Sequence, residues 1–423
     1  MARAASSLVR PVRAPSGASA VLQELRAFQW NGRPTAREVT SVGLARRPIV
    51  VETLVNEFWT SKQRAASSLH EVSYRACFKP QLPRFFIDRF TKTGDVVYDP
   101  FMGRGTTVIE AALAGRIPAG CDINPLSTVL AEPRLAPPTV EEVGARLDSL
   151  NLSLAVSYPK DLEVFYHPET LREICALREY LLACEQRGWL DGVDRWIRMV
   201  AVNRLTGHSP GFFSVYTLPP NQATTIDAQV KINASREQVP PRRDVRALIV
   251  AKTRSLLSDC DSTARSTLLR STQRAKLITG PARSTPQLKS GSVSLVVTSP
   301  PFLDVVNYAA DNWLRAWFCG IEISETPMSV YKKLPTWQAA MTEVFRELAR
   351  VLRPGGHVAF EVGEVRNGKI KLEEAVLPCG VAAGLKPLLV VINSQQFTKT
   401  ANCWGVKNNA KGTNTNRIVV FRK

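Results

Sequence analysis

The sequence predicts an α/β fold in which helices pack on the faces of a sheet. Residues 94–115 read as a short strand, a glycine-rich turn and a helix. Residues 119–124 contain a second short strand that ends in Asp122, which is the arrangement of a βαβ unit in a doubly wound sheet. The apolar runs within 275–280 and 293–297 have the length of further buried strands.

The turn of the first unit has the composition of a ligand-binding loop. Gly103 and Gly105 let the backbone approach a bound molecule closely. We expect Thr106 and Thr107 to cap the following helix while its N-terminus faces an anionic group. Residues 99–101, Asp-Pro-Phe, are not needed for binding a pyrophosphate. The expected ligand is therefore a nucleoside that carries an amino acid, with an acid at the end of the second strand contacting ribose hydroxyls.

A second informative stretch is Thr298-Ser299-Pro300-Pro301-Phe302, which follows the apolar run 293–297. The two prolines stiffen the backbone and leave carbonyl oxygens as acceptors. The Ser299 hydroxyl and the Pro300 carbonyl can accept hydrogens from an exocyclic amine, while the Phe302 ring stacks on a flat heterocycle. This combination predicts a pocket for the amino group of a base.

Both stretches resemble motifs of one family. Residues 99–107 resemble the S-adenosylmethionine-binding motif of amino-directed DNA methyltransferases. Residues 298–302 resemble their catalytic motif, in the form typical of cytosine-N4 enzymes. Residues 78–87 resemble the segment that covers the methionine end of the cofactor, and residues 352–360 resemble the turn into the fifth strand. The resemblance covers residues 70–130 and 276–423.

The resemblance implies a Rossmann-like class I methyltransferase fold. Its sheet is expected to be mixed and seven-stranded, with a mostly helical insertion between the cofactor and catalytic motifs. The implied cofactor is S-adenosyl-L-methionine, and no metal is expected. The implied cofactor-binding residues are Lys79, Asp99, Pro100, Phe101, Gly103, Gly105, Thr106, Thr107, Asp122, Ile123 and Asn124. The implied catalytic residues are Ser299, Pro300, Pro301 and Phe302.

The implied function is site-specific methylation of cytosine N4 in duplex DNA, as protection opposite a companion restriction endonuclease. Adenine-N6 methylation is a rival function, although relatives with that activity more often carry Asp or Asn at the position of Ser299. An RNA amino-methyltransferase is a second rival, and a non-catalytic nucleic-acid-binding protein with the same fold is a third. The chain departs from the family at Pro281, where relatives commonly place an Asp that touches the adenine of the cofactor. Thr279 and Ser284 are the candidate substitutes for that acid.

Five segments are expected along the chain. They are a flexible basic arm (1–23), a helical extension (24–68), the cofactor half of the methyltransferase domain (69–150), a helical basic insertion for target recognition (151–275) and the catalytic half (276–423). Apolar spacing of three and four residues predicts helices at 21–28 and 51–58. Further helices are expected to begin at Pro168 and to span 191–204.

The charge balance indicates a polyanionic partner. Lys and Arg number 55 against 37 Asp and Glu, a formal net charge of +18. Residues 231–276 form the most basic stretch and are expected to contact DNA phosphates, unless they form a solvated helix face. The loops 207–222 and 405–417 are further candidates for DNA contact. The first loop could instead pack on the core. The Asn, Gly and Thr residues of the second loop could serve only to form a turn.

The eight cysteines are dispersed and form no Cys-x-x-Cys pair, which is typical of a reduced cytoplasmic protein. The four histidines are equally scattered, so the sequence offers no metal site. No apolar run approaches the length of a membrane span. We therefore expect a soluble protein with no membrane partner.

Overall fold

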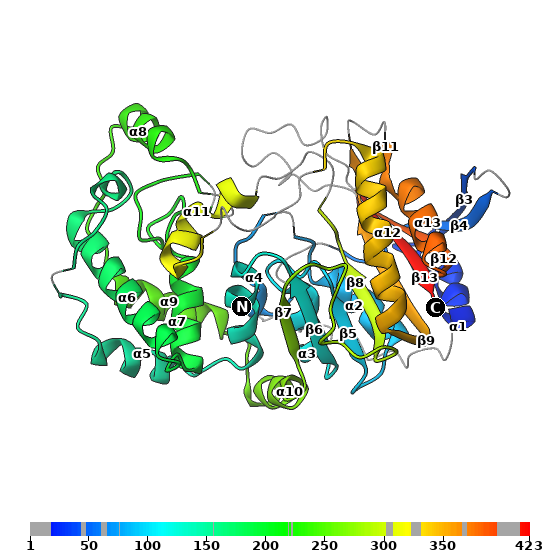
Figure 1. The fold of residues 1–423 in the computed structure, drawn as a ribbon, viewed down its shortest axis with the longest axis horizontal. Coiled ribbons are helices and arrows are strands. Elements are labelled where there is room, and N and C mark those ends of the chain that lie inside the picture. Colours follow the sequence, from blue (N-terminus) through cyan, green and yellow to red (C-terminus); the bar gives the residue numbers. More distant parts are fainter. Residues whose placement is uncertain are drawn as a thin grey trace.

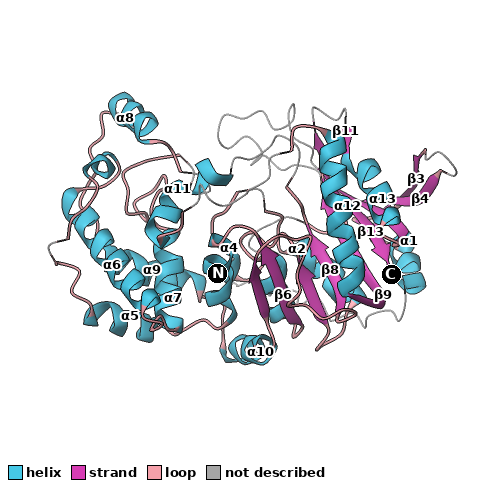
Figure 2. Cartoon of the chain, in the orientation of Figure 1, coloured by secondary structure: helices cyan, strands magenta, loops and turns pink. Residues whose placement is uncertain are grey.

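The chain forms two lobes that lie side by side (Figure 1). The computed structural model describes residues 18–43, 48–60, 66–75, 77–154, 156–218, 220, 223–301, 308–322, 331–365, 370–395 and 415–423. Figure 2 shows the long strands gathered in one lobe and the helices of the central part of the chain in the other.

The sheet lobe is built on nine strands. In spatial order they are β3 (Ala36–Val42), β4 (Ile49–Asn56), β12 (Lys386–Ser394), β13 (Thr415–Arg422), β9 (Leu352–Val362), β8 (Val293–Thr298), β5 (Val96–Asp99), β6 (Ile117–Asp122) and β7 (Lys276–Thr279). Two short pairs stand outside this sheet: β1 (Gln29–Trp30) with β2 (Arg33–Pro34), and β10 (Glu364–Val365) with β11 (Ile370–Lys371).

Seven of these strands form the predicted mixed sheet. β7, β6, β5, β8 and β9 run parallel to one another, and β13 is antiparallel to both β9 and β12. The carboxyl ends of the five parallel strands therefore lie at one edge, where ligands bind in open α/β sheets. The expected α/β class and mixed seven-stranded core are confirmed, and the N-terminal residues add β3 and β4.

The prediction of a helix at 51–58 is wrong, because these residues fall largely in strand β4. β4 pairs parallel to β12 and antiparallel to β3. The apolar spacing of the segment is compatible with a helix, but Ile49, Val50, Val51, Thr53 and Val55 are β-branched and favour a strand. Pairing with a neighbouring strand that is distant in sequence decides between the two.

Helices cover both faces of the sheet. One face packs against α1 (Ala18–Ala27) and α2 (Gln81–Phe90), and the other packs against α12 (Leu334–Val351) and α13 (Leu372–Ala382). Alternation along β8 sends Leu295 and Val297 to the first face and Val296 to the second. The predicted helix at 21–28 is confirmed as α1, which begins within the expected N-terminal arm. Residues 1–17 of that arm lie outside the described residues.

The second lobe is helical, as expected for the insertion. Its helices are α4 (Leu126–Ala131), α5 (Val140–Ser149), α6 (Pro168–Gln186), α7 (Gly192–Val202), α8 (Ile226–Ser235), α9 (Val245–Leu256) and α11 (Tyr308–Cys319). α10 (Ser262–Thr272), which also belongs to the expected insertion, lies below the sheet instead (Figure 1). The predicted helices at Pro168 and 191–204 are confirmed as α6 and α7. Within the described ranges, no helix is both long and apolar enough to span a bilayer.

The core of the helical lobe joins segments that are far apart in sequence. Leu314 and Phe318 of α11 pack in the same cluster as residues of α5, α6, α7 and α9. α3 (Thr106–Leu113) contributes Val108 and Ile109 to this cluster. The turn that carries the glycines and the segment that follows the Ser-Pro-Pro motif are thus both attached to the helical lobe.

Candidate active site

The glycine turn follows β5 and leads into α3. Gly103 and Gly105 have φ values of +50° and +80°, a region that favours glycine. A Cβ at Gly105 would lie 2.7 Å from the Cβ of Ala131, so this position also lacks room for a side chain. The Gly103 N–H donates to an Oδ of Asp122 at 2.8 Å, which connects the turn to the end of β6.

The start of α3 differs from our expectation. Gly105 is its N-cap, and no side chain caps the helix. Thr106 accepts a hydrogen bond from Arg104, and Thr107 donates to the Val297 carbonyl at 3.0 Å. The expected capping by these two threonines is therefore wrong, because both hydroxyls take part in tertiary contacts. The absence of a side-chain cap leaves the positive end of the helix dipole open to an anionic ligand.

Asp122 lies at the carboxyl end of β6. Its two carboxylate oxygens accept hydrogen bonds from the N–H groups of Gly103, at 2.8 Å, and Asn124, at 2.9 Å. Burial raises the pKa of this carboxyl above its usual value, although the backbone hydrogen bonds oppose the shift. Asp122 lines the cavity described below, so a ligand hydroxyl can approach its carboxylate.

Asp99 lies at the end of β5 and is 1% exposed. One of its oxygens accepts hydrogen bonds from the Thr298 hydroxyl at 2.6 Å and from the Phe101 N–H at 3.1 Å. Burial raises the pKa of Asp99 to about 7, and the hydrogen bonds from Thr298 and Phe101 limit that rise. Asp99 thus links the glycine turn to the end of β8.

The Ser-Pro-Pro motif begins where β8 ends. Ser299 is partly buried, and the carbonyl of Pro301 accepts a hydrogen bond from Trp337 Nε1 at 2.9 Å. That bond fixes the end of the motif against α12. Phe302 lies outside the described residues.

Glu361 is a candidate functional residue that we did not anticipate from the sequence. It lies on β9, which pairs with β8 so that Thr298 is opposite Phe360. Glu361 is 8% exposed and receives hydrogen bonds from the Ser299 hydroxyl and, at 3.1 Å, from Asn416. Burial raises its pKa to about 6, against the effect of these two donors. The sequence feature that could have revealed this residue is a carboxylate near the end of the apolar run 358–362.

One cavity of about 370 Å³ is lined by Asp99, Asp122 and Ser299, whereas Glu361 is not part of its lining. Its lining includes the following residues from the predicted site: Asp99, Pro100, Phe101, Gly103, Thr106, Asp122, Ile123, Asn124, Ser299 and Pro301. The lining does not include Lys79, Gly105, Thr107 or Pro300. Gly105 and Thr107 instead make the structural contacts described above, and Pro300 is buried. Lys79 lies near Arg104. The pKa of Lys79 is lowered mainly by burial and, to a smaller extent, by the Arg104 charge.

A wall of the cavity comes from a short segment before the glycine turn, of which we predicted only Phe78. Tyr74, Arg75, Cys77 and Phe78 line the cavity, and the Tyr74 hydroxyl accepts a hydrogen bond from Asn124 at 3.1 Å. This segment lies before the glycine turn and makes no recognisable motif with it in the sequence.

Two buried arginines hold that wall against the glycine turn. Arg104 donates to the carbonyls of His70 and Val72 at 3.3 and 2.8 Å. Arg134 donates to the carbonyl of Leu69 at 3.0 Å and also to that of Arg104. The pKa of Arg134 is lowered to about 9, mainly by burial and to a smaller extent by the nearby Arg104 charge. The charge is satisfied by main-chain oxygens rather than by a carboxylate.

Several cations of the basic stretch 231–276 are held by contacts inside the protein. Arg242 forms ion pairs with Glu169 and Glu173, and Lys252 pairs with Glu71. Main-chain carbonyls accept hydrogen bonds from Arg246, Arg265 and Lys276. Fewer cations are thus available for phosphates than the composition indicates.

Four of the remaining basic side chains lie at two different ends of the molecule. α10 packs against the C-terminal end of α3, where Ser271 donates to the Ala112 carbonyl at 3.1 Å, away from the glycine turn. Figure 1 shows α10 below the sheet and α8 on the opposite side, above the helical lobe. Exposed Lys231 and Arg236 lie on or directly after α8, whereas Arg270 and Arg274 lie on or after α10.

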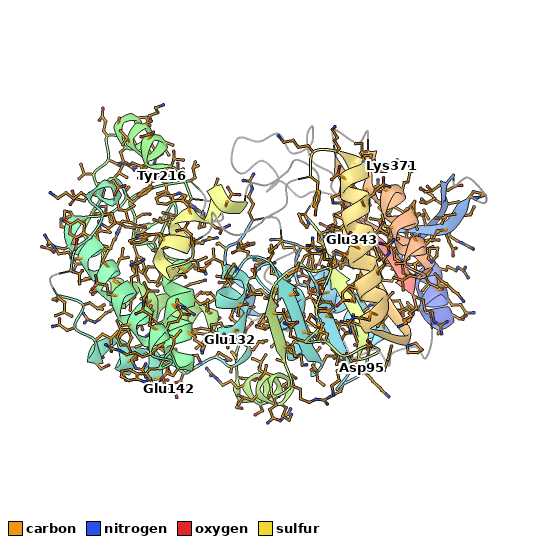
Figure 3. The ribbon with its side chains drawn as sticks, viewed as in Figure 1. Asp95, Glu132, Glu142, Tyr216, Glu343 and Lys371 are labelled. Atoms are coloured by element: carbon orange, nitrogen blue, oxygen red, sulfur yellow. The ribbon has the colours of Figure 1, made fainter. Side chains whose placement is uncertain are left out.

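The first candidate loop, 207–222, packs its two phenylalanines in the protein interior. Phe212 and Phe213 are 6% and 0% exposed, so they pack in the protein, in line with the structural reading of this loop. Tyr216 is partly exposed, and the Arg236 guanidinium lies 3.8 Å from the centre of its ring. Figure 3 shows Tyr216 in the helical lobe below α8. Residues 219, 221 and 222 of the first loop and 405–414 of the second lie outside the described residues.

Comparison with known proteins identifies a related segment. Residues 49–130 match the N6_N4_Mtase family, described as DNA methylase. The type II methyltransferase M.MjaII of Methanocaldococcus jannaschii is 33% identical over 93 residues, 22% of this chain and 18% of that protein. M.MvaI of Kocuria varians, also a type II methyltransferase, is 30% identical over 97 residues, 22% of this chain and 20% of that protein.

A third relative is the tRNA (guanine(10)-N2)-dimethyltransferase of Methanocaldococcus jannaschii. It is 30% identical over 146 residues, which make up 31% of this chain and 38% of that protein. This chain therefore spans well under half the length of each of these curated relatives. The matched DNA methylase segment contains β5, the glycine turn, α3 and β6.

Proposed function

We propose that this chain, which is related to amino-directed DNA methyltransferases through residues 49–130, methylates the N4 amino group of cytosine in duplex DNA. The proposal depends chiefly on one observation. A single cavity is lined both by the glycine turn after β5 and by Ser299 and Pro301 after β8. A methyl donor held by the turn would thus lie beside a base held by the Ser-Pro-Pro motif.

The residues of the cavity fit S-adenosylmethionine. The volume of about 370 Å³ is in the range of small-molecule sites. The carboxylate of Asp122 would accept hydrogen bonds from the ribose hydroxyls, and the uncapped start of α3 would favour the ligand's carboxylate. When bound, this cofactor supplies an electrophilic methyl group on a sulfonium sulfur.

The Ser299–Glu361 hydrogen bond determines how Ser299 would meet the target amine. We infer that the hydroxyl donates its proton to Glu361, so that the serine oxygen would present its lone pairs to the cavity. A base inside a duplex hides its amino group, and the target must therefore leave the stack. Ser299 would then accept an amine hydrogen, and Phe302 is proposed to stack on the ring. The Pro300 carbonyl, which the resemblance implies as a second acceptor, belongs to a buried residue outside the cavity lining.

The reaction requires one bond to form and one to break. The amine nitrogen forms a bond to the methyl carbon, while the carbon–sulfur bond breaks and its electron pair stays on sulfur. The nitrogen then loses one proton, which Ser299 can relay to the Glu361 carboxylate. Orientation of the amine and stabilisation of its developing positive charge would provide most of the rate enhancement.

Glu361 should give the turnover an acid limb near pH 6. Its pKa is raised to about 6, so the carboxylate predominates above that pH and is lost as the pH falls through it. Turnover should fall accordingly on the acid side. Glu361→Gln should lower turnover by about tenfold or more and remove this limb. A pH–rate profile between pH 5 and 8 measures both effects, and an unchanged limb in the variant would assign it to another group.

The identity of Ser299 favours cytosine over adenine as the target base, through the resemblance to cytosine-N4 enzymes. Adenine-N6 methylation by the same cavity is the first alternative. The similarity to a tRNA dimethyltransferase supports an RNA amine as a second alternative. The similarity to type II methyltransferases supports a protective role beside a restriction endonuclease.

The α8 side of the helical lobe is the proposed phosphate-contacting surface. Replacing Lys231 and Arg236 together by alanine should weaken DNA binding and reduce the slope of log affinity against log salt by about 2. The matched control replaces Arg270 and Arg274, at the end of α10 away from the glycine turn. Fluorescence anisotropy at several salt concentrations measures the slopes. Equal losses in both double variants would contradict the assignment to α8.

Transfer of a labelled methyl group tests the proposed function. Purified protein is incubated with methyl-labelled S-adenosylmethionine and either mixed-sequence duplex DNA or total RNA, and label in the precipitated nucleic acid is counted. Label in DNA alone supports the proposal. Label in RNA alone would show that the substrate is RNA and not DNA. Label in neither nucleic acid would favour a nucleic-acid-binding protein without methyltransferase activity.

A further inference from the structure

We propose that Glu343 and Arg283 recognise the adenine ring of the cofactor, with Glu343 in place of the acid that the sequence lacks at Pro281. This inference rests on the proposed function, because it concerns the same cavity and its methyl donor. It assigns a specificity-determining role to a helix, α12, that carries none of the predicted motifs.

The position of Glu343 supports this assignment. Pro281, Ala282 and Arg283 follow β7 and line the cavity, and Glu343 of α12 lines the same cavity. Figure 3 shows Glu343 on the side of α12 that faces the middle of the molecule. A carboxylate is thus present in the part of the cavity where the chain has lost the expected one, but it comes from a different element.

The two candidate substitutes, Thr279 and Ser284, lie elsewhere. The Thr279 hydroxyl lies 3.3 Å from that of Thr128, and Thr279 does not line the active-site cavity. Ser284 lines a neighbouring cavity, not the one that contains Asp122. Arg283 and Glu343 line both cavities and therefore lie between them.

The surroundings of Glu343 have the apolar character that a purine ring requires. Met341 and Val344 of α12 are 1% and 5% exposed and line the cavity beside it. Ala282 and the partly buried Tyr331 complete this part of the lining. Apolar walls with a few polar groups at defined positions are typical of small-molecule sites.

Glu343 and Arg283 are exposed, and their charges are not paired within the described part of the protein. No hydrogen bond or ion pair of either side chain is found among the described residues. The next acid on the helix differs in this respect. Glu347 pairs with Arg350 at 2.6 Å and accepts a hydrogen bond from the Thr285 hydroxyl, also at 2.6 Å. Glu347 therefore has a structural role, whereas Glu343 remains available for a ligand.

These two groups match the hydrogen-bonding edge of adenine. The exocyclic amine of adenine donates, so it would bind the Glu343 carboxylate, and the ring nitrogens accept, so one of them would bind the Arg283 guanidinium. Hypoxanthine has a carbonyl in place of that amine. Its oxygen would face the carboxylate with no hydrogen between them, which disfavours hypoxanthine although Glu343 and Arg283 are both exposed side chains.

Calorimetric titration with two product analogues tests this inference. S-adenosylhomocysteine and its deaminated counterpart, S-inosylhomocysteine, are titrated into the wild-type protein and the Glu343→Gln variant. The wild type should prefer the adenosyl ligand by about tenfold or more. The glutamine amide can donate to the inosyl carbonyl, so the preference should fall by about tenfold in Glu343→Gln. The matched control, Glu374→Gln, alters a partly exposed carboxylate on α13 that pairs with Lys371, and should keep the wild-type ratio.

The outcomes separate this inference from the proposed function. An unchanged ligand ratio in Glu343→Gln, with normal binding of S-adenosylhomocysteine, would overturn the role of Glu343 and leave the methyltransferase proposal standing. Failure of the wild type to bind either ligand would overturn both. Arg283→Met gives an independent check, because it should weaken binding of S-adenosylhomocysteine several-fold while the melting temperature stays that of the wild type.

Discussion

Replacing Ser299 by alanine is expected to lower turnover by about a hundredfold or more and to leave the affinity for S-adenosylmethionine nearly unchanged. The Ser299 oxygen is proposed to contact only the target amine, so its loss affects the transition state and not the cofactor. The substitution also removes the donor to Glu361, which closes the proposed route for the proton. Single-turnover rates with saturating DNA and an equilibrium titration with S-adenosylhomocysteine measure the two quantities separately.

Ser292→Ala provides the matched control for this substitution. Ser292 precedes β8, and its hydroxyl donates to the Lys289 carbonyl at the opposite end of that strand from Ser299. The Ser292→Ala variant should have the turnover of the wild type. Equal losses of turnover and cofactor affinity in Ser299→Ala would contradict the role given to this serine and would indicate a collapsed cavity instead.

Replacing Asp122 by alanine is expected to produce the largest loss of cofactor affinity, about a hundredfold or more. Three interactions are lost together. The N–H groups of Gly103 and Asn124 lose their acceptors, at 2.8 and 2.9 Å, and the ribose loses its proposed partner. Asp122→Asn retains one oxygen acceptor and should lose less, about tenfold. Titration of both variants with S-adenosylhomocysteine measures these affinities.

Asp95→Asn is the control for the effect of removing an acid beside the parallel strands. Asp95 precedes β5 at the edge opposite the glycine turn, where it pairs with Arg353 at 3.2 Å. This variant should bind the cofactor as the wild type does. Wild-type affinity in Asp122→Ala would exclude Asp122 from the cofactor site.

The sequence was sufficient to predict the part of the site that depends on local pattern. A strand, two glycines with positive φ and a helix occupy consecutive residues, so their geometry follows from short-range sterics. Asp122 could be placed because parallel strands bring their carboxyl ends to one edge. The same reasoning brought Ser299 to that edge at the end of β8.

The remaining features depend on contacts between distant residues. Glu361 faces Ser299 only because β9 pairs with β8, and the resemblance extended over that strand without singling out the acid. Residues 51–58 had helical spacing, but pairing with β12 makes most of them a strand. The basic stretch 231–276 read as one surface, although its helices α8 and α10 lie at opposite ends of the molecule. Composition counts charges and does not record where they lie or which are paired.

Identification of the methylated nucleoside tests the central claim most directly. DNA is incubated with the protein and labelled S-adenosylmethionine, digested to nucleosides and separated by liquid chromatography with mass spectrometry, alongside a Ser299→Ala reaction. We expect label in N4-methylcytosine with the wild type and about a hundredfold less with the variant. Label in N6-methyladenine would contradict the base assignment while keeping the cavity and its chemistry. Label in a ring-carbon product such as 5-methylcytosine would contradict the account of Ser299 as the acceptor for an exocyclic amine.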